Sequence, residues 1–156
     1  MTTAEWLLRA GFPYYKTVGM RRVTTNPVDL AVADGMLYVL NRSSVQTEIR
    51  KISLDDEDLG TISGQGSDPG KLQWPVQILL DSEGKLYVSD EATDRISIFD
   101  PDGEFVGSWG QSGAADGDLS RPSGITFDSD ENMYVADTMN HRVQKFTRDG
   151  KFLGKW

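Results

Sequence analysis

One pattern of residues recurs three times along this 156-residue chain, at a spacing of about 47 residues. Each copy begins at a proline, at Pro27, Pro75 and Pro122, and reaches a Tyr-Val pair eleven or twelve residues later. A fixed period of this length is typical of proteins that repeat one small structural unit. The pattern therefore predicts a repeat architecture, in which each unit buries its apolar faces against its neighbours.

The composition within a unit predicts strands. Four short stretches of the third unit are rich in β-branched and aromatic residues, namely residues 124–128, 133–137, 143–147 and 152–156. They are separated by Asp, Asn and Gly, the residues of tight turns. Four strands per repeat favour a β-propeller over a sandwich or a barrel. We therefore predict an all-β propeller of four-stranded blades, with units at residues 20–62, 63–109 and 110–156.

The first 19 residues differ from the repeats. Thr2 stands three residues before Glu5, which is the spacing of a helix capping box, and an apolar run follows. This predicts a short helix within residues 1–12, which either packs on the body of the protein or docks on another chain. Residues 14–19 have the composition of a strand, and we hypothesise that they add to the edge of a partner's sheet.

Charge and composition limit the partners and the chemistry. The net charge is −8 and the pI is about 4.6, which argues against binding to the phosphate backbone of nucleic acids. The chain has no cysteine, so disulfides, thiolate catalysis and cysteine-bound metals are excluded. Neither a signal peptide nor an apolar stretch long enough to cross a membrane is present in the sequence. We therefore expect a cytoplasmic protein with no membrane partner.

The third unit resembles a known family. Its run from Tyr134 to Phe146 contains Asn140-His141-Arg142 and closely resembles the NHL repeat, which is named after an Asn-His-Leu sequence. The second unit is similar to the family over residues 87–100, and the resemblance covers residues 20–156 as a whole. It implies a propeller of the NHL type, which usually has about six blades.

The resemblance leaves the function broad. Some NHL proteins bind protein or RNA, some are sensor domains of bacterial kinases, and related propellers are lyases that use histidine and metal in the central channel. The chain has a single histidine, His141, so we assign no catalytic residue, metal ligand or cofactor. A non-enzymatic module that binds a protein segment or a small molecule is our first interpretation. The alternative is a metal-dependent lyase or hydrolase with its site in the channel.

Two charged pairs recur at equivalent positions of the second and third units. They are Asp90 with Arg95 and Asp137 with Arg142, and each is expected to join the second and third strands of a blade. A catalytic pair would be expected once, so their repetition indicates structural ion pairs. Asn41 replaces the aspartate in the first unit, where we expect the contact to be weaker.

Binding residues in propellers gather on the loops at one face, held by a rigid scaffold. We select one side chain from each loop of that face as a candidate ligand contact: Arg42, Trp74, Glu91, Arg121 and Thr138. The other repeated tryptophans, Trp109 and Trp156, are expected to be packing residues of outer strands.

Three blades are too few to close a propeller, because closed rings use roughly four to eight. The chain is then either a piece of a longer protein or one half of a ring made by two copies joined head to tail. Two copies of three blades give six blades, the usual number in propellers of the NHL type. We therefore expect a homodimer that closes a six-bladed ring.

Overall fold

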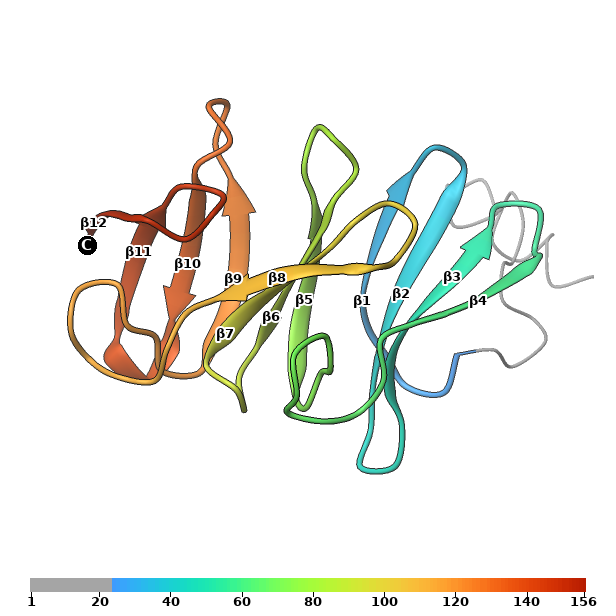
Figure 1. The fold of residues 1–156 in the computed structure, drawn as a ribbon, viewed down its shortest axis with the longest axis horizontal. Coiled ribbons are helices and arrows are strands. Elements are labelled where there is room, and N and C mark those ends of the chain that lie inside the picture. The colour runs from blue at the N-terminus through green and yellow to red at the C-terminus, as the bar shows by residue number, and fades with distance from the viewer. Residues whose placement is uncertain (1–23) are drawn as a thin grey trace, which may run out of the picture.

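A computed structural model describes residues 24–156; the predicted helix at 1–12 and the predicted strand at 14–19 lie outside this range. Within it the strands form three four-stranded antiparallel sheets, which follow one another in chain order (Figure 1). The predicted all-β fold with three four-stranded units is confirmed. The described residues contain no helix long and apolar enough to cross a membrane.

Each sheet is a simple meander, which we call a blade. Blade 1 contains β1 (Pro27–Ala33), β2 (Met36–Arg42), β3 (Thr47–Ser53) and β4 (Asp58–Ile62). Blade 2 contains β5 (Pro75–Leu80), β6 (Leu86–Asp90), β7 (Arg95–Phe99) and β8 (Phe105–Trp109). Blade 3 contains β9 (Pro122–Phe127), β10 (Met133–Asp137), the 3₁₀ turn η1 (Thr138–Asn140), β11 (Arg142–Phe146) and β12 (Phe152–Lys155).

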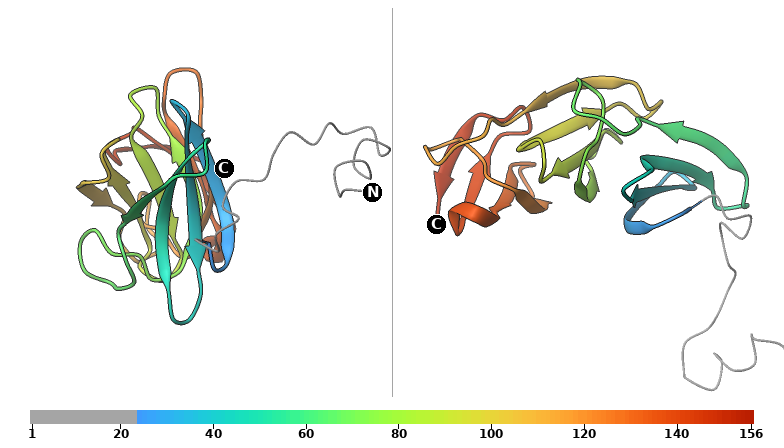
Figure 2. Two further views of the ribbon diagram at one scale, coloured as in Figure 1. Left: turned by 90° about the vertical axis from the view of Figure 1, so that its right-hand side faces the viewer. Right: turned by 90° about the horizontal axis from the view of Figure 1, so that it is seen from below.

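The blades follow an arc, seen in the right-hand view of Figure 2. Strand β1 lies beside β5 and β5 lies beside β9, so the first strand of each blade is the innermost. All five residues of β6 are buried, because blade 2 has a neighbour on both of its faces. Among residues 24–156, blades 1 and 3 each have a neighbouring blade on one face only.

The hydrophobic core lies at the two seams between the blades. One cluster of buried side chains comes from blades 1 and 2, and the other from blades 2 and 3. Leu72 and Leu119, from the linkers that precede blades 2 and 3, are fully buried and fix those linkers to the core. Each blade therefore depends on its neighbour for burial of apolar surface.

Charged groups reinforce the seam between blades 2 and 3. Arg148, in the turn after β11, lies 2.8 Å from Glu131 and 3.3 Å from Asp81 of blade 2. Asp81 also accepts the hydroxyl of Tyr87, at 3.2 Å. Burial, reinforced by the Asp81 charge, raises the pKa of the Tyr87 hydroxyl well above its ordinary value. The Tyr87 hydroxyl therefore stays protonated and acts as a seam contact.

Candidate functional site

All the loops that we selected from the sequence lie at one end of the blades, which we call the loop face. It carries the β2–β3, β6–β7 and β10–β11 connections and the linkers 63–74 and 110–121, along the lower edge in Figure 1. The candidate ligand contacts are placed there as follows: Arg42 ends β2, Trp74 precedes β5, Glu91 follows β6, Arg121 precedes β9 and Thr138 follows β10.

A pocket of about 300 Å³ opens on the loop face. Its lining residues are Gln73, Trp74, Glu91, Ala92 and Arg121. The two linkers and the β6–β7 turn thus meet here, and three of the five candidate contacts line one cavity. Trp74 is 41% exposed, so its indole offers apolar surface at the mouth of the pocket.

Arg42 supports Trp74 from blade 1. Its guanidinium carbon lies 4.8 Å from the centre of the Trp74 ring, a cation–π distance. Its Nη1 donates to the carbonyl of Pro75 at 3.1 Å. Arg42 is therefore held by contacts to blade 2 and positions the indole beside the pocket.

Arg121 supplies the opposite wall. Its guanidinium lies 2.9 Å from the carboxylate of Glu91, and its backbone N–H donates to Asp94 at 2.7 Å. Arg121 and Asp94 both have a φ of 51°, in the left-handed region that residues with a Cβ seldom adopt. Two adjoining residues in a costly backbone conformation are often found where a structure positions functional groups.

Thr138 lies outside the pocket. Its hydroxyl lies 2.7 Å from the hydroxyl of Ser123, and both residues belong to blade 3. The sequence analysis missed Gln73 and Ala92, which are direct neighbours of Trp74 and Glu91 in the sequence. It also missed Asp94, three residues after Glu91. Only the packing of the two linkers against the β6–β7 turn brings Gln73 and Ala92 to the pocket and Asp94 to Arg121, and one unit of the repeat does not reveal that packing.

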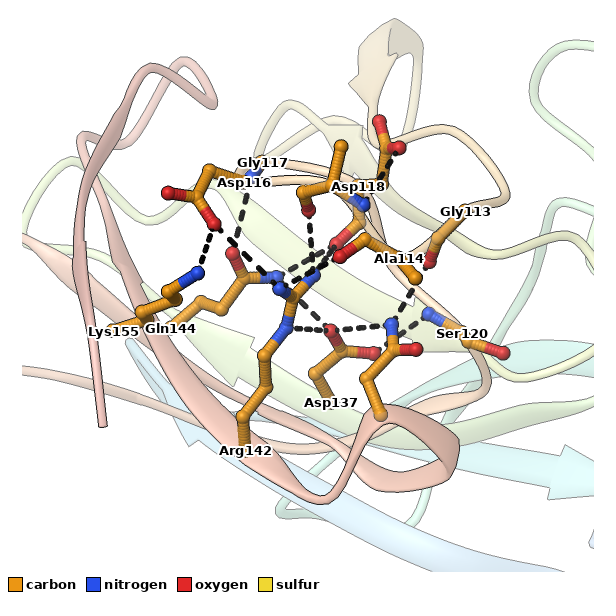
Figure 3. A network of polar contacts seen from close by, with 12 residues as sticks. Gly113, Ala114, Asp116, Gly117, Asp118, Ser120, Asp137, Arg142, Gln144 and Lys155 are labelled. Atoms are coloured by element: carbon orange, nitrogen blue, oxygen red, sulfur yellow. Dashed lines mark hydrogen bonds and ion pairs between the residues drawn. The ribbon is translucent and has the colours of Figure 1, made fainter.

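A network of polar contacts lies beneath the linker of blade 3 (Figure 3). Asp137 is its centre and is fully buried. One of its carboxylate oxygens accepts the backbone N–H of Ser120 at 2.6 Å. The other accepts three side-chain donors: Arg142 at 2.7 Å, Asn140 at 2.9 Å and Gln144 at 3.0 Å.

Arg142 extends this network to the linker itself. Its terminal nitrogens donate to the carbonyls of Ala114, Ala115 and Asp118 at 2.7–3.0 Å. The Asp137–Arg142 ion pair thus fastens strands β10 and β11 to the segment that forms one wall of the loop face. All of these partners belong to blade 3 or to its linker.

The prediction of an equivalent ion pair in blade 2 is wrong. Asp90 accepts four backbone N–H groups, and among residues 24–156 no ion pair joins it to Arg95. Arg95 donates instead to linker carbonyls, and its Nε has no partner. Thr93 and Ser97 replace Asn140 and Gln144, and their buried hydroxyls are also unpartnered. These shorter side chains do not reach the aspartate, so the network is incomplete.

Blade 1 has lost the network further. Asn41 is fully buried, and neither its amide nitrogen nor its carbonyl oxygen has a hydrogen-bond partner. It lies opposite Glu48 in the strand register, where the other blades have arginine. Among residues 24–156 no hydrogen bond joins Asn41 to Glu48, so the weaker contact expected in blade 1 stays a prediction.

His141 adopts a left-handed conformation at the end of η1, with its backbone N–H donating to Thr138. Among residues 24–156 the structure brings together no three His, Asp or Glu side chains that could hold a metal ion.

Comparison with known proteins identifies the repeat. The family profile of the NHL repeat matches residues 119–146, which run from the buried Leu119 to the end of β11. The chain contains an NHL repeat. The resemblance inferred from the third unit is thereby confirmed.

Two curated proteins of that description are similar in sequence. NHL repeat-containing protein 3 of Homo sapiens is 33% identical over 79 residues, which are 49% of this chain and 23% of that protein. The Mus musculus protein of the same name is 30% identical over 95 residues, which are 59% of this chain and 27% of that protein. The chain thus spans about a quarter of the length of these NHL relatives.

Solved structures share the fold at low sequence identity. A virginiamycin B lyase from Staphylococcus aureus matches with a TM-score of 0.63 and 18% identity, over 85% of this chain and 41% of that chain. A putative exported protein from Bacteroides fragilis matches with a TM-score of 0.66 and 12% identity, over 85% and 38%. A putative 6-phosphogluconolactonase from Bacteroides fragilis has a TM-score of 0.59 and 16% identity, over 85% and 43%. These similarities support a propeller-like arrangement of the three blades.

Proposed function

We propose that this chain is a non-enzymatic binding module whose loop face holds a polypeptide segment of a partner protein. The observation that carries the proposal is the pocket in which Trp74, Glu91 and Arg121 converge from separate segments. Tryptophan and arginine are enriched among the anchor residues of protein interfaces, and Trp74 and Arg121 supply one of each. The cavity of about 300 Å³ suits one or two side chains of such a segment.

Replacing Trp74 with alanine tests this proposal. Peptides selected from a random-sequence phage library on the wild-type chain are expected to bind Trp74→Ala roughly 30-fold more weakly, the usual loss for an anchor residue. The measurement is fluorescence polarisation with the selected peptides. Leu59→Ala is the control, because Leu59 is 45% exposed on β4, the outer strand of blade 1. Peptides that bind Trp74→Ala unchanged would place the binding surface elsewhere.

We also propose that two copies close a six-bladed ring head to tail. The arc of three blades and the exposed apolar side chains on both end blades support this closure. Light scattering on the full chain is expected to give twice the chain mass of 17.3 kDa. A mass of one chain at every concentration would rule out the homodimer.

The alternative is a metal-dependent lyase or hydrolase with its site in the channel. A lyase and a putative lactonase among the structural neighbours favour it. Elemental analysis of the purified chain separates the two functions. Zinc or calcium bound in stoichiometric amount would favour the enzyme over the binding module.

A further inference from the structure

At the two open ends of the arc, side chains are exposed at positions that are buried wherever a blade has a neighbour. Ile78 and Ile125 occupy the same register position of β5 and β9, and each is 3% exposed. Leu30 is their equivalent in β1, the first strand among residues 24–156, and it is 57% exposed. At the other end Trp156 is 69% exposed, although we expected it to pack.

The inner seam between blades 2 and 3 shows what Trp156 lacks. Its repeat equivalent Trp109 packs on Phe146 of blade 3, with ring centres 4.8 Å apart. The Trp109 indole also donates to the carbonyl of Arg148 at 3.0 Å and lies directly against Gly150. A Cβ atom at Gly150 would lie 2.4 Å from the indole, so this contact requires glycine.

The seam between blades 1 and 2 has the same construction. Ile62 is the equivalent of Trp109, and it lies against Gly103, where a Cβ would come within 2.6 Å. Lys51 reaches across to the carbonyl of Pro101 at 3.0 Å and lies 5.6 Å from the ring of Tyr38. Blade 3 carries the same pair of residue types on its open face.

That pair is Lys145 and Tyr134. The Nζ atom of Lys145 lies 5.1 Å from the centre of the Tyr134 ring, and this ring stacks on Trp156. The open face of blade 3 thus presents a tyrosine, a lysine and a tryptophan in the positions that an inner seam uses. Leu30 at the open face of blade 1 supplies the matching apolar side chain.

We propose that Trp156 of one copy docks on the β3–β4 turn of a second copy, with Leu30 of that copy buried at the inner side of the same seam. This inference rests on the proposed ring closure and assigns its contact. The closed ring contains two such seams, related by a twofold axis.

The sequence departs from the inner seams at two positions of this contact. Asp56 stands where Gly103 and Gly150 stand, and by the geometry at those two glycines a Cβ at this position would meet the docked Trp156. The second position is Gly124, which has no side chain that could accept a hydrogen bond from the next blade.

Both inner seams contain such a hydrogen bond. Asp29 accepts the backbone N–H of Ile78 at 2.9 Å, and Gln77 accepts that of Ile125 at 2.7 Å. Gly124 is the next residue in this series, and a Cβ there would meet only ordinary contacts at 3.8 Å or more. The seam between copies is therefore weaker than the inner seams, and two substitutions should strengthen it.

Sedimentation of the full chain over a dilution series tests the assignment. Trp156→Ala is expected to weaken dimerisation by roughly 30-fold per seam. Asp56→Gly is expected to tighten it by about tenfold per seam, because it removes an overpacked atom. Gly124→Gln is expected to tighten it by roughly fivefold per seam, the effect of one neutral hydrogen bond.

Matched controls separate the causes. Asp56→Asn removes the charge but keeps the Cβ, and Gly124→Ala adds a Cβ without an acceptor, so neither should tighten the dimer. A wild-type dimer that none of the variants alters would overturn this contact and leave ring closure standing. A chain that stays monomeric in wild type and in the Asp56→Gly, Gly124→Gln double variant would overturn both. Dimerisation of the double variant alone would support the contact and reject closure of the natural chain.

Discussion

Asp137→Asn is expected to lower the free energy of unfolding by about 3–5 kcal/mol, the usual cost of removing one partner from a buried ion pair. The substitution keeps the size of the side chain. It removes the charge that faces Arg142, and it places an N–H₂ group opposite side chains that are themselves donors. Because Asp137 is fully buried, water cannot replace the lost acceptor.

Asp90→Asn is the matched control for this substitution. Asp90 is also fully buried, but its partners are neutral backbone N–H groups and it has no ion pair to Arg95. Its loss is expected to be about 1–3 kcal/mol. Urea unfolding followed by tryptophan fluorescence measures both values. Equal losses would mean that the Asp137–Arg142 pair contributes no more than the backbone contacts do.

The repeat made most of the fold predictable. The strands expected in the third unit agree with β9–β12 to within two residues at each end, because turn residues mark the boundaries of short strands. The selection of one face was also possible, since loops of equivalent position in each repeat must lie at the same end of their blades. Trp74, Glu91 and Arg121 were chosen on that basis alone.

The finer contacts depended on differences between the repeats. Asp90 and Asp137 look alike in the sequence, yet only Asp137 pairs with its arginine. This difference accompanies the exchange of Asn140 and Gln144 for the shorter Thr93 and Ser97, which no pattern of charges reveals. Trp156 likewise matches Trp109 in position, but its burial depends on a neighbouring blade that the described residues do not include. Repeat equivalence therefore predicts the backbone better than it predicts the partners of a side chain.

Gly150→Ala is the second substitution expected to have a large effect, a loss of about 2–4 kcal/mol in the free energy of unfolding. Two causes add. The φ of Gly150 is 88°, a conformation that costs energy for any residue with a Cβ, and the new Cβ would overlap the Trp109 indole. Gly107→Ala is the control, because a Cβ atom at Gly107 would meet open space and the φ of this residue is ordinary. Its effect is expected to stay within about 0.5 kcal/mol.

Combining Gly150→Ala with Trp109→Val separates the two causes in one unfolding experiment. If overlap with the indole dominates, the double variant is more stable than the sum of the two single losses predicts, because the smaller side chain accepts the Cβ. If backbone strain dominates, the two losses add. The first result would establish that the glycine serves the blade seam, and it would strengthen the same argument for Asp56, which occupies the equivalent position at the open face.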